Sequence, residues 1–331
     1  MVAVWHVRMP RLFPLVVLLS VMGCSEGRDD TLGLPDPQSS TSARDNQTGA
    51  VQEPQPVAPN RDVPVPDGFR GDVHPLLSGH NRLDVAARWS PIRPGRALRV
   101  GYFPPVFYEP FTALRTASAQ RTYGDRDFSA FLPAQVESVG QMWSVDAERA
   151  VEFLRQWCPA ASTKLIAPGR RAGPDGMFAI LRAVAPTHWD VVLRMHAEFH
   201  LEPGVFLTPS CFLGRMIVNR QTGSIDYFSL SIPHDKGLNA TLTVRLETEA
   251  LIDIVNIEQM ELVGGDAEIA ARVSWEESLD LDVAHERLKQ AFFKFLDIDW
   301  VPPERALAKA QELAKPVMAV VLWGCLDEQS C

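Results

Sequence analysis

The sequence predicts an α+β protein, in which a mostly antiparallel β-rich domain is followed by a helix, a strand and a thiol-bearing loop. Strict alternation of apolar and polar residues over 191–201 predicts a half-buried strand. Helical periodicity replaces this alternation after Ser274. A run typical of a buried strand, 316–323, then leads into a polar loop that reaches Cys331. With 331 residues, 46% of them hydrophobic, the chain can bury a substantial core.

The N-terminal segment has the pattern of an export leader. Arg8 and Arg11 precede an apolar stretch over 12–22. This stretch is short for a membrane span but typical of a signal peptide. The following Gly23 and Cys24 resemble a bacterial lipobox, although Met22 replaces the usual small residue. We therefore expect residues 1–23 to be a signal peptide and Cys24 to carry a lipid that holds an exported protein to the membrane. A plain signal peptide, cleaved or uncleaved, is the alternative.

Residues 24–66 have the composition of a disordered tether. Seven prolines lie between positions 25 and 66, and no aromatic residue does. Such a segment cannot bury enough apolar surface to offset the entropy lost on ordering. We expect it to hold the folded domain away from the membrane, facing the periplasm or the cell exterior.

The β-rich domain is expected over residues 67–297. A strand is predicted over 99–103, and Ser144 with Asp146 predicts a capped helix that runs to Trp157. Further strands are predicted over 178–184, 191–201, 214–219, 225–232, 238–246, 251–257 and 260–263, with a hairpin turn at 221–223. Ser274 and Glu277 have capping-box spacing ahead of a helix that continues to about residue 295.

The last segment, 298–331, is predicted to be the beginning of a thioredoxin-like domain. Pro302 and Pro303 suit the first turn of a helix that runs to about residue 315. A strand over 316–323 and the loop with Cys331 follow. Helix, strand and thiol loop in this order open a thioredoxin-like fold, which here is incomplete.

The cysteines after Cys24 fall into two kinds. Cys158 and Cys211 lie beside apolar residues and are expected to be structural or inert, whereas Cys325 and Cys331 flank an acidic loop. Acidic neighbours raise the pKa of a thiol, which disfavours Cys331 as a nucleophile acting alone. In an oxidising compartment these four cysteines allow three complete pairings, among which the sequence does not choose. A Cys325–Cys331 disulfide that closes a small regulatory loop is one further alternative.

His196, Glu198 and His200 are the side chains that most resemble metal ligands. On one strand, however, the two histidines would lie about 13 Å apart, too far to share an ion. We expect a solvated polar face here, with no metal and no bound cofactor. Asn239 begins an Asn-Ala-Thr sequon, a short pattern that also arises by chance.

The overall charge limits the classes of partner. A formal net charge of -9 leaves no excess of lysine and arginine for a basic binding surface. Nucleic acid is therefore not an expected partner, and neither is an anionic membrane bound through basic side chains.

The C-terminal residues carry a resemblance to the selenoprotein N family. LWGCLDEQSC, which ends at Cys331, is similar to the family's LWGALDDQSC, which selenocysteine and glycine follow. Similar matches recur in collinear order from His188 onward, at 194–199, 208–209, 212, 214, 228–230, 233, 238–239, 259–262 and 274–277. A collinear set of matches is more specific than any single motif among them.

The resemblance implies a redox site at the loop. The codon after Cys331 would be UGA, read as selenocysteine, and the selenol would be the attacking nucleophile with Cys331 as its resolving partner. Trp323 would pack beside the pair, and Cys325, where the family has alanine, is a secondary candidate. The residues that would shape the loop are Gly324, Asp327, Glu328, Gln329 and Ser330.

The function implied is that of a thiol-disulfide oxidoreductase of an oxidising compartment, with redox proteins or disulfide substrates as partners. No cofactor is implied beyond selenocysteine itself, and a chain without that residue is expected to be inactive. Animal members of the family are glycoproteins of the endoplasmic reticulum membrane tied to calcium handling, but this chain has no EF-hand signature. The alternative is a lipid-anchored envelope binding module whose cysteines are structural.

Overall fold

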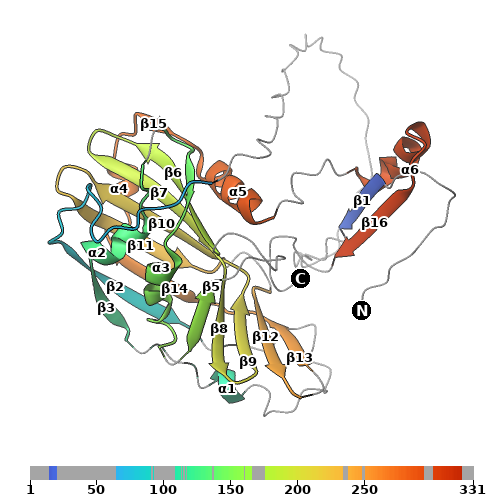
Figure 1. Cartoon of the computed structure of the whole chain (residues 1–331), viewed down its shortest axis with the longest axis horizontal. Coiled ribbons are helices and arrows are strands. Elements are labelled where there is room, and N and C mark those ends of the chain that lie inside the picture. Colours follow the sequence, from blue (N-terminus) through green and yellow to red (C-terminus); the bar gives the residue numbers. More distant parts are fainter. Residues whose placement is uncertain are drawn as a thin grey trace, which may run out of the picture. The chain divides into compact units, whose positions relative to one another are not determined.

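The β-rich part of the chain consists of two antiparallel sheets (Figure 1). The computed structural model describes residues 15–20, 65–90, 92, 109–112, 114, 116, 118–135, 138–159, 161–165, 176–233, 238–247, 250–293 and 301–322. The predicted α+β class with antiparallel strands is confirmed. The strand predicted over 99–103 lies outside the described residues.

The larger sheet has nine strands within the described residues. Its order is β15-β6-β7-β10-β11-β14-β2-β3, with β4 paired to β6, and each of these pairs is antiparallel. The strands are β2 (Arg82–Trp89), β3 (Gln120–Gly124), β4 (Met142–Ser144), β6 (Met177–Val184), β7 (His188–Met195), β10 (Phe212–Asn219), β11 (Ser224–Ser231), β14 (Met260–Gly265) and β15 (Glu277–Ser278).

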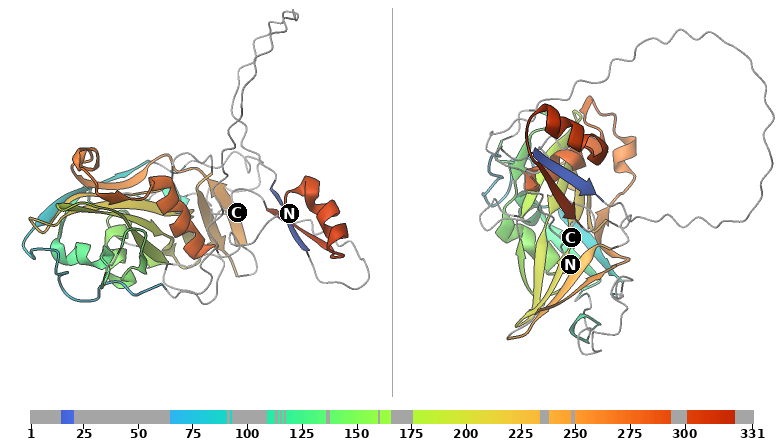
Figure 2. Two further views of the ribbon diagram at one scale, coloured as in Figure 1. Left: turned by 90° about the horizontal axis from the view of Figure 1, so that it is seen from above. Right: turned by 90° about the vertical axis from the view of Figure 1, so that its right-hand side faces the viewer.

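The smaller sheet has the order β13-β12-β9-β8-β5 (Figure 1). Figure 2 shows the ribbon from two further directions. Its described strands are β5 (Ser162–Leu165), β8 (Ala197–Glu202), β9 (Val205–Pro209), β12 (Ala240–Arg245) and β13 (Ala250–Val255). Polar and apolar residues alternate along β12, with Leu242 buried and Thr243 half-buried. One face of this sheet therefore contributes to the core, as period-two patterning requires.

The long strand predicted over 191–201 is in fact two strands in different sheets. β7 ends at Met195 in the larger sheet and β8 begins at Ala197 in the smaller one. His196 lies at the break, where its backbone N–H donates to the carbonyl of Gly176 at 2.7 Å. The apolar alternation passes through this residue unchanged, because both sheets bury the same side of the chain in one core. The prediction of one continuous strand was wrong for that reason.

The predicted hairpin is confirmed as β10 and β11. Their register pairs Asn219 with Ser224, and Gly223 in the turn has a φ of 66°. A Cβ at that glycine would lie 2.7 Å from the backbone nitrogen of Ser78. Glycine is required there both by the positive φ and by the close backbone approach.

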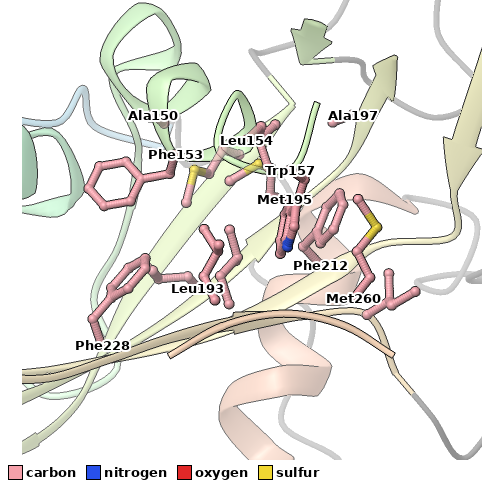
Figure 3. Close-up of a cluster of buried hydrophobic side chains, with 14 of the residues drawn as sticks. Ala150, Phe153, Leu154, Trp157, Leu193, Met195, Ala197, Phe212, Phe228 and Met260 are labelled. Carbon is pink, nitrogen blue, oxygen red and sulfur yellow. The ribbon is translucent and has the colours of Figure 1, made fainter. Parts of the chain in front are cut away.

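The main core lies between the sheets and α3 (Ala147–Leu154). The Trp157 ring stacks on Phe212 of β10, with centroids 4.9 Å apart, and its indole N–H donates to the carbonyl of Glu261 on β14. Phe153 of α3 contacts Phe228 of β11, with centroids 5.1 Å apart (Figure 3). The helix and the turn after it thus join three neighbouring strands of the larger sheet.

The N-cap of one long helix is the residue that the sequence predicted, and the N-cap of another is not. Asp146 caps α3 by accepting a hydrogen bond from the backbone N–H of Glu148, as the sequence predicted. The cap of α5 (Leu281–Phe292) is Asp280, which accepts from the N–H of Asp282. The expected capping box at Ser274 was wrong, because the following residues pair with β6 as the short strand β15.

The remaining described helices are short, except one. They are α1 (Glu109–Thr112), α2 (Asp125–Phe128), the 3-10 turn Ser129–Phe131 and α4 (Ile269–Arg272). α6 (Pro303–Glu312) has proline in its first turn, as predicted, and β16 (Val317–Leu322) follows it.

Candidate functional site

The residues predicted to form the redox site lie outside the described part of the chain. This applies to Cys325 and Cys331, to the loop residues Trp323, Gly324, Asp327, Glu328, Gln329 and Ser330, and to the lipidation candidate Cys24. The strand that precedes the loop, β16, is described and ends at Leu322. The predicted helix and the strand after it are confirmed up to Leu322. The thioredoxin-like fold stays a prediction.

α6 and β16 form a small unit with an apolar centre. Val301 and Ala306 are buried there, and Val317 packs against them. β16 pairs in parallel with β1 (Leu15–Ser20), with Leu15 opposite Val317. β1 belongs to the apolar stretch expected to be the core of a signal peptide. Cleavage before Cys24 would remove β1, so pairing with β16 and leader removal exclude each other in one molecule.

The two described thiols are unsuited to nucleophilic chemistry. Cys158 and Cys211 are both buried, each with 3% of its surface exposed. Burial raises the pKa of the Cys158 thiol to about 12, so at neutral pH it carries its proton. A protonated, inaccessible thiol neither attacks a disulfide nor binds a metal readily. Both residues therefore serve packing, which agrees with the prediction that they are structural or inert.

The predicted polar face over 196–200 is divided between two environments. His200 is half-buried and lies edge-on to Phe206, and its Nε2 donates to a Glu198 carboxylate oxygen at 2.5 Å. His196 is fully buried in the β7–β8 break. The predicted solvated face was therefore wrong at His196, which lies at the break between the sheets, whereas His200 lies on β8. Nowhere among the described residues do three or more potential ligands gather.

The strongest buried electrostatic cluster lies on the face of the larger sheet covered by α5. Asp190 of β7 is completely buried and accepts hydrogen bonds from two guanidinium groups. Arg182 of β6 donates at 2.6 Å, and Arg215 of β10 donates through its Nε at 3.0 Å and through a terminal nitrogen at 2.6 Å. Burial lowers the pKa of Arg215, but the hydrogen bonds and charge of Asp190 raise it by more. The pKa of Arg215 is therefore raised on balance. The carboxylate thus holds three adjacent strands together.

A second pair, Arg194 and His196, extends this cluster toward the end of α5. The Nε of Arg194 donates to the Nε2 of His196 at 3.1 Å. The imidazole centroid lies 4.5 Å from that of Phe292 and 5.6 Å from that of Phe293. Burial and the Arg194 charge hold the pKa of His196 well below 6.5, against a raising effect of the Ser210 backbone. His196 is therefore a neutral acceptor at physiological pH.

Comparison with known proteins gives one relationship. Selenoprotein N of Mus musculus is 26% identical over 267 residues, which are 65% of this chain and 48% of that protein. Selenoprotein N of Danio rerio is 29% identical over 194 residues, which are 49% of this chain and 35% of that protein. The human protein is 25% identical over 267 residues. This chain is a relative of selenoprotein N.

The relationship has limits of coverage. The chain spans about half the length of the selenoprotein N relatives it matches, or less. No family model matches it, and no solved structure does. Among the helices in the described ranges, none has both the length and the apolar character needed to cross a membrane.

In this relative of selenoprotein N, sequence reasoning missed the Arg–Asp–Arg cluster. Its members come from three strands, and no spacing in the sequence links them. The available signal was Asp190 itself, which stands between Trp189 and Val191 in an otherwise apolar run. A carboxylate in a strand buried on both faces requires cationic partners, and arginine is the usual one.

The sequon at Asn239 also finds a structural explanation. Asn239 is fully buried, and its side-chain amide donates to the carbonyls of Pro233 and Ile257. Its side-chain oxygen accepts from the N–H of Ile257 at 2.8 Å. An asparagine occupied in this way is inaccessible as a glycosylation acceptor in the folded domain.

Proposed function

We propose that this relative of selenoprotein N is a thiol-disulfide oxidoreductase of an oxidising compartment, with Cys331 and a selenocysteine after it as the redox pair. The observation that carries the proposal is the relationship to selenoprotein N, together with the terminal motif LWGCLDEQSC. The burial of Cys158 and Cys211 supports it, because it leaves Cys325 and Cys331 as the candidates for redox chemistry after Cys24.

The proposed chemistry is a two-step exchange. The selenolate attacks one sulfur of a substrate disulfide, forms a selenium–sulfur bond and releases the other sulfur as a thiolate. The Cys331 thiolate then attacks that mixed bond, displaces the substrate's second thiolate and closes a bond to selenium. The substrate has gained two electrons and the pair has lost them. An external dithiol of a partner redox protein would restore the reduced pair.

Disulfide reduction by the full-length product tests the proposal. The gene is expressed with selenocysteine insertion at the position after Cys331, and dithiothreitol-driven reduction of a peptide disulfide is followed. Cys331→Ser is expected to lower turnover and, in a single-turnover mixture of the reduced protein and the peptide disulfide without dithiothreitol, to accumulate the mixed selenium–sulfur adduct, detectable by mass spectrometry. Cys325→Ser examines the secondary candidate, and Cys158→Ala is the matched control with unchanged turnover. Full activity in Cys331→Ser would overturn the proposal.

The membrane location is tested at Cys24. A lipid on this cysteine would hold the exported domain to the membrane through the tether over 24–66. In a bacterial host, Cys24→Ala is expected to move the protein from the membrane fraction to the soluble fraction and to remove the acyl mass from its N-terminal peptide. Unchanged membrane retention in Cys24→Ala would refute lipid anchoring.

A further inference from the structure

α5 covers the larger sheet through one stripe of its surface. Ala284, Leu288 and Phe292 are buried against residues of β6 and β7 in a cluster separate from the main core. His285 is half-buried and lies four residues after Leu281 and three before Leu288, on the same side of the helix. A histidine thus lies within the apolar stripe through which α5 packs on β6 and β7. The helix itself lies beside these strands in Figure 1.

The sheet beneath this stripe carries an excess of positive charge. It contributes three guanidinium groups, those of Arg182, Arg194 and Arg215, and one fully buried carboxylate, that of Asp190. Burial and the charges of Arg194 and Arg215 lower the pKa of His285, although Asp282 of the same helix raises it. A proton that binds to His285 at the underside of α5 would therefore be repelled by the charges of Arg194 and Arg215.

Among the described residues, the other ionisable groups near α5 offer this proton only weak compensation. Tyr227 of β11 faces Arg215 and raises the pKa of that guanidinium. On α5 itself, Asp282 and Glu286 are exposed, and Glu286 pairs with Lys289 at 3.5 Å. Exposed carboxylates are screened by solvent and compensate a buried cation weakly.

The C-terminal end of α5 depends on a neutral His196. The ring accepts its hydrogen bond from Arg194 on Nε2, and only an unprotonated nitrogen can accept. Protonation would remove this acceptor and place two cations 3.1 Å apart beneath the rings of Phe292 and Phe293. The guanidinium of Arg194, which lies 5.7 Å from the centroid of Phe293, would meet the same repulsion.

We propose that α5 is a pH-sensitive strap, released from β6 and β7 when His196 and His285 take up protons in mildly acidic surroundings. In the released form both rings reach water and regain an ordinary affinity for protons. A group whose folded pKa is depressed below 6.5 favours the attached form fully above that pH and loses this contribution as the pH falls. Attachment of α5 therefore weakens on acidification below about pH 6.5 and not on alkalinisation.

Hydrogen exchange measured by mass spectrometry on the full chain tests the strap. Exchange of the α5 amides is compared at pH 7.5 and pH 5.5 after correction for the intrinsic rates. One imidazole that titrates near 6.5 only in the released form increases release roughly tenfold at pH 5.5. We expect an acceleration of at least that size in α5, with the β10 and β11 amides unchanged.

Two variants and one control separate the strap from general acid destabilisation. His285→Gln stays neutral at every pH and is expected to lower the acid acceleration of α5 exchange, as is His196→Gln where it folds. His80→Gln, an exposed histidine elsewhere, should leave it unchanged. Equal acceleration in α5, β10 and β11 would assign the effect to global unfolding, for example through buried His74, and would overturn the proposal. An acceleration unaltered in His285→Gln would overturn the role of that residue.

Discussion

Replacement of Asp190 by alanine should be among the most destabilising single changes in the described part of the chain. The carboxylate is completely buried and neutralises Arg182 and Arg215, whose side chains are 16% and 26% exposed. The variant leaves two largely buried guanidinium groups without their counter-ion. Breaking a buried ion pair by removing one partner costs about 3–5 kcal/mol. Because two cations lose their partner, we expect the free energy of unfolding to fall by the upper part of that range.

Urea unfolding at pH 7.5, followed by far-ultraviolet circular dichroism, measures this loss. Arg215→Met is the matched single variant: it removes one cation but leaves the Arg182–Asp190 pair, so a smaller loss is expected. The triple replacement Arg182→Met, Asp190→Leu and Arg215→Met should regain most of the stability, because it removes every buried charge at once. A loss below about 1 kcal/mol in Asp190→Ala would refute the assignment of these contacts as a buried charge cluster, since that is the range of exposed pairs.

Other consequences of the fold can be measured directly. Cys158 and Cys211 should resist a thiol reagent such as iodoacetamide at pH 8 in the folded protein and react in urea, because burial keeps them inaccessible and raises the pKa of Cys158 to about 12. Mass spectrometry of the peptide that carries each cysteine measures this, and fast modification of these two without denaturant would contradict the packing. Asn239→Ala should cost about 1–3 kcal/mol for each buried backbone group left unpaired, as measured by urea unfolding, and a neutral effect would show that water replaces the amide. Trp157→Ala should lower the free energy of unfolding by about 3–5 kcal/mol through the cavity it opens against Phe212, whereas a cost under 1 kcal/mol would mean that the core collapses around the site.

The sequence predicted local pairing well and long-range pairing poorly. The β10–β11 hairpin could be read from a turn of three residues, because its register is set by neighbours along the chain. Nothing local indicates that β14 pairs with β2, whose paired residues Leu262 and Ala87 are far apart in sequence. The break between β7 and β8 at His196 could not be predicted for a related reason. The alternation of buried and exposed side chains keeps its period of two where the chain passes from one sheet to the other.

The predicted and the described candidate sites come from different kinds of information. The redox loop was predicted from a contiguous motif ending at Cys331, which needs no tertiary structure to recognise. The charge cluster at Asp190 needs three strands in register, with Val192 opposite Arg215 on β10 and Phe178 opposite Arg194 on β6. Composition hides this cluster as well, because a chain with a net charge of -9 suggests no concentration of arginine.

The attachment of α5 also sets how far the redox segment can reach. Eight residue steps separate Phe293, at the end of α5, from Val301, and a fully extended chain spans at most about 3.5 Å per step. With α5 attached, Val301 therefore lies within about 28 Å of Phe293. If α5 is released and unwinds, the chain is next held at Leu279, whose N–H donates to the carbonyl of Arg182, and 22 steps extend the limit to about 77 Å. Protons taken up beneath α5 would thus enlarge the volume accessible to α6, β16 and the loop after them without any change in the chemistry of that loop.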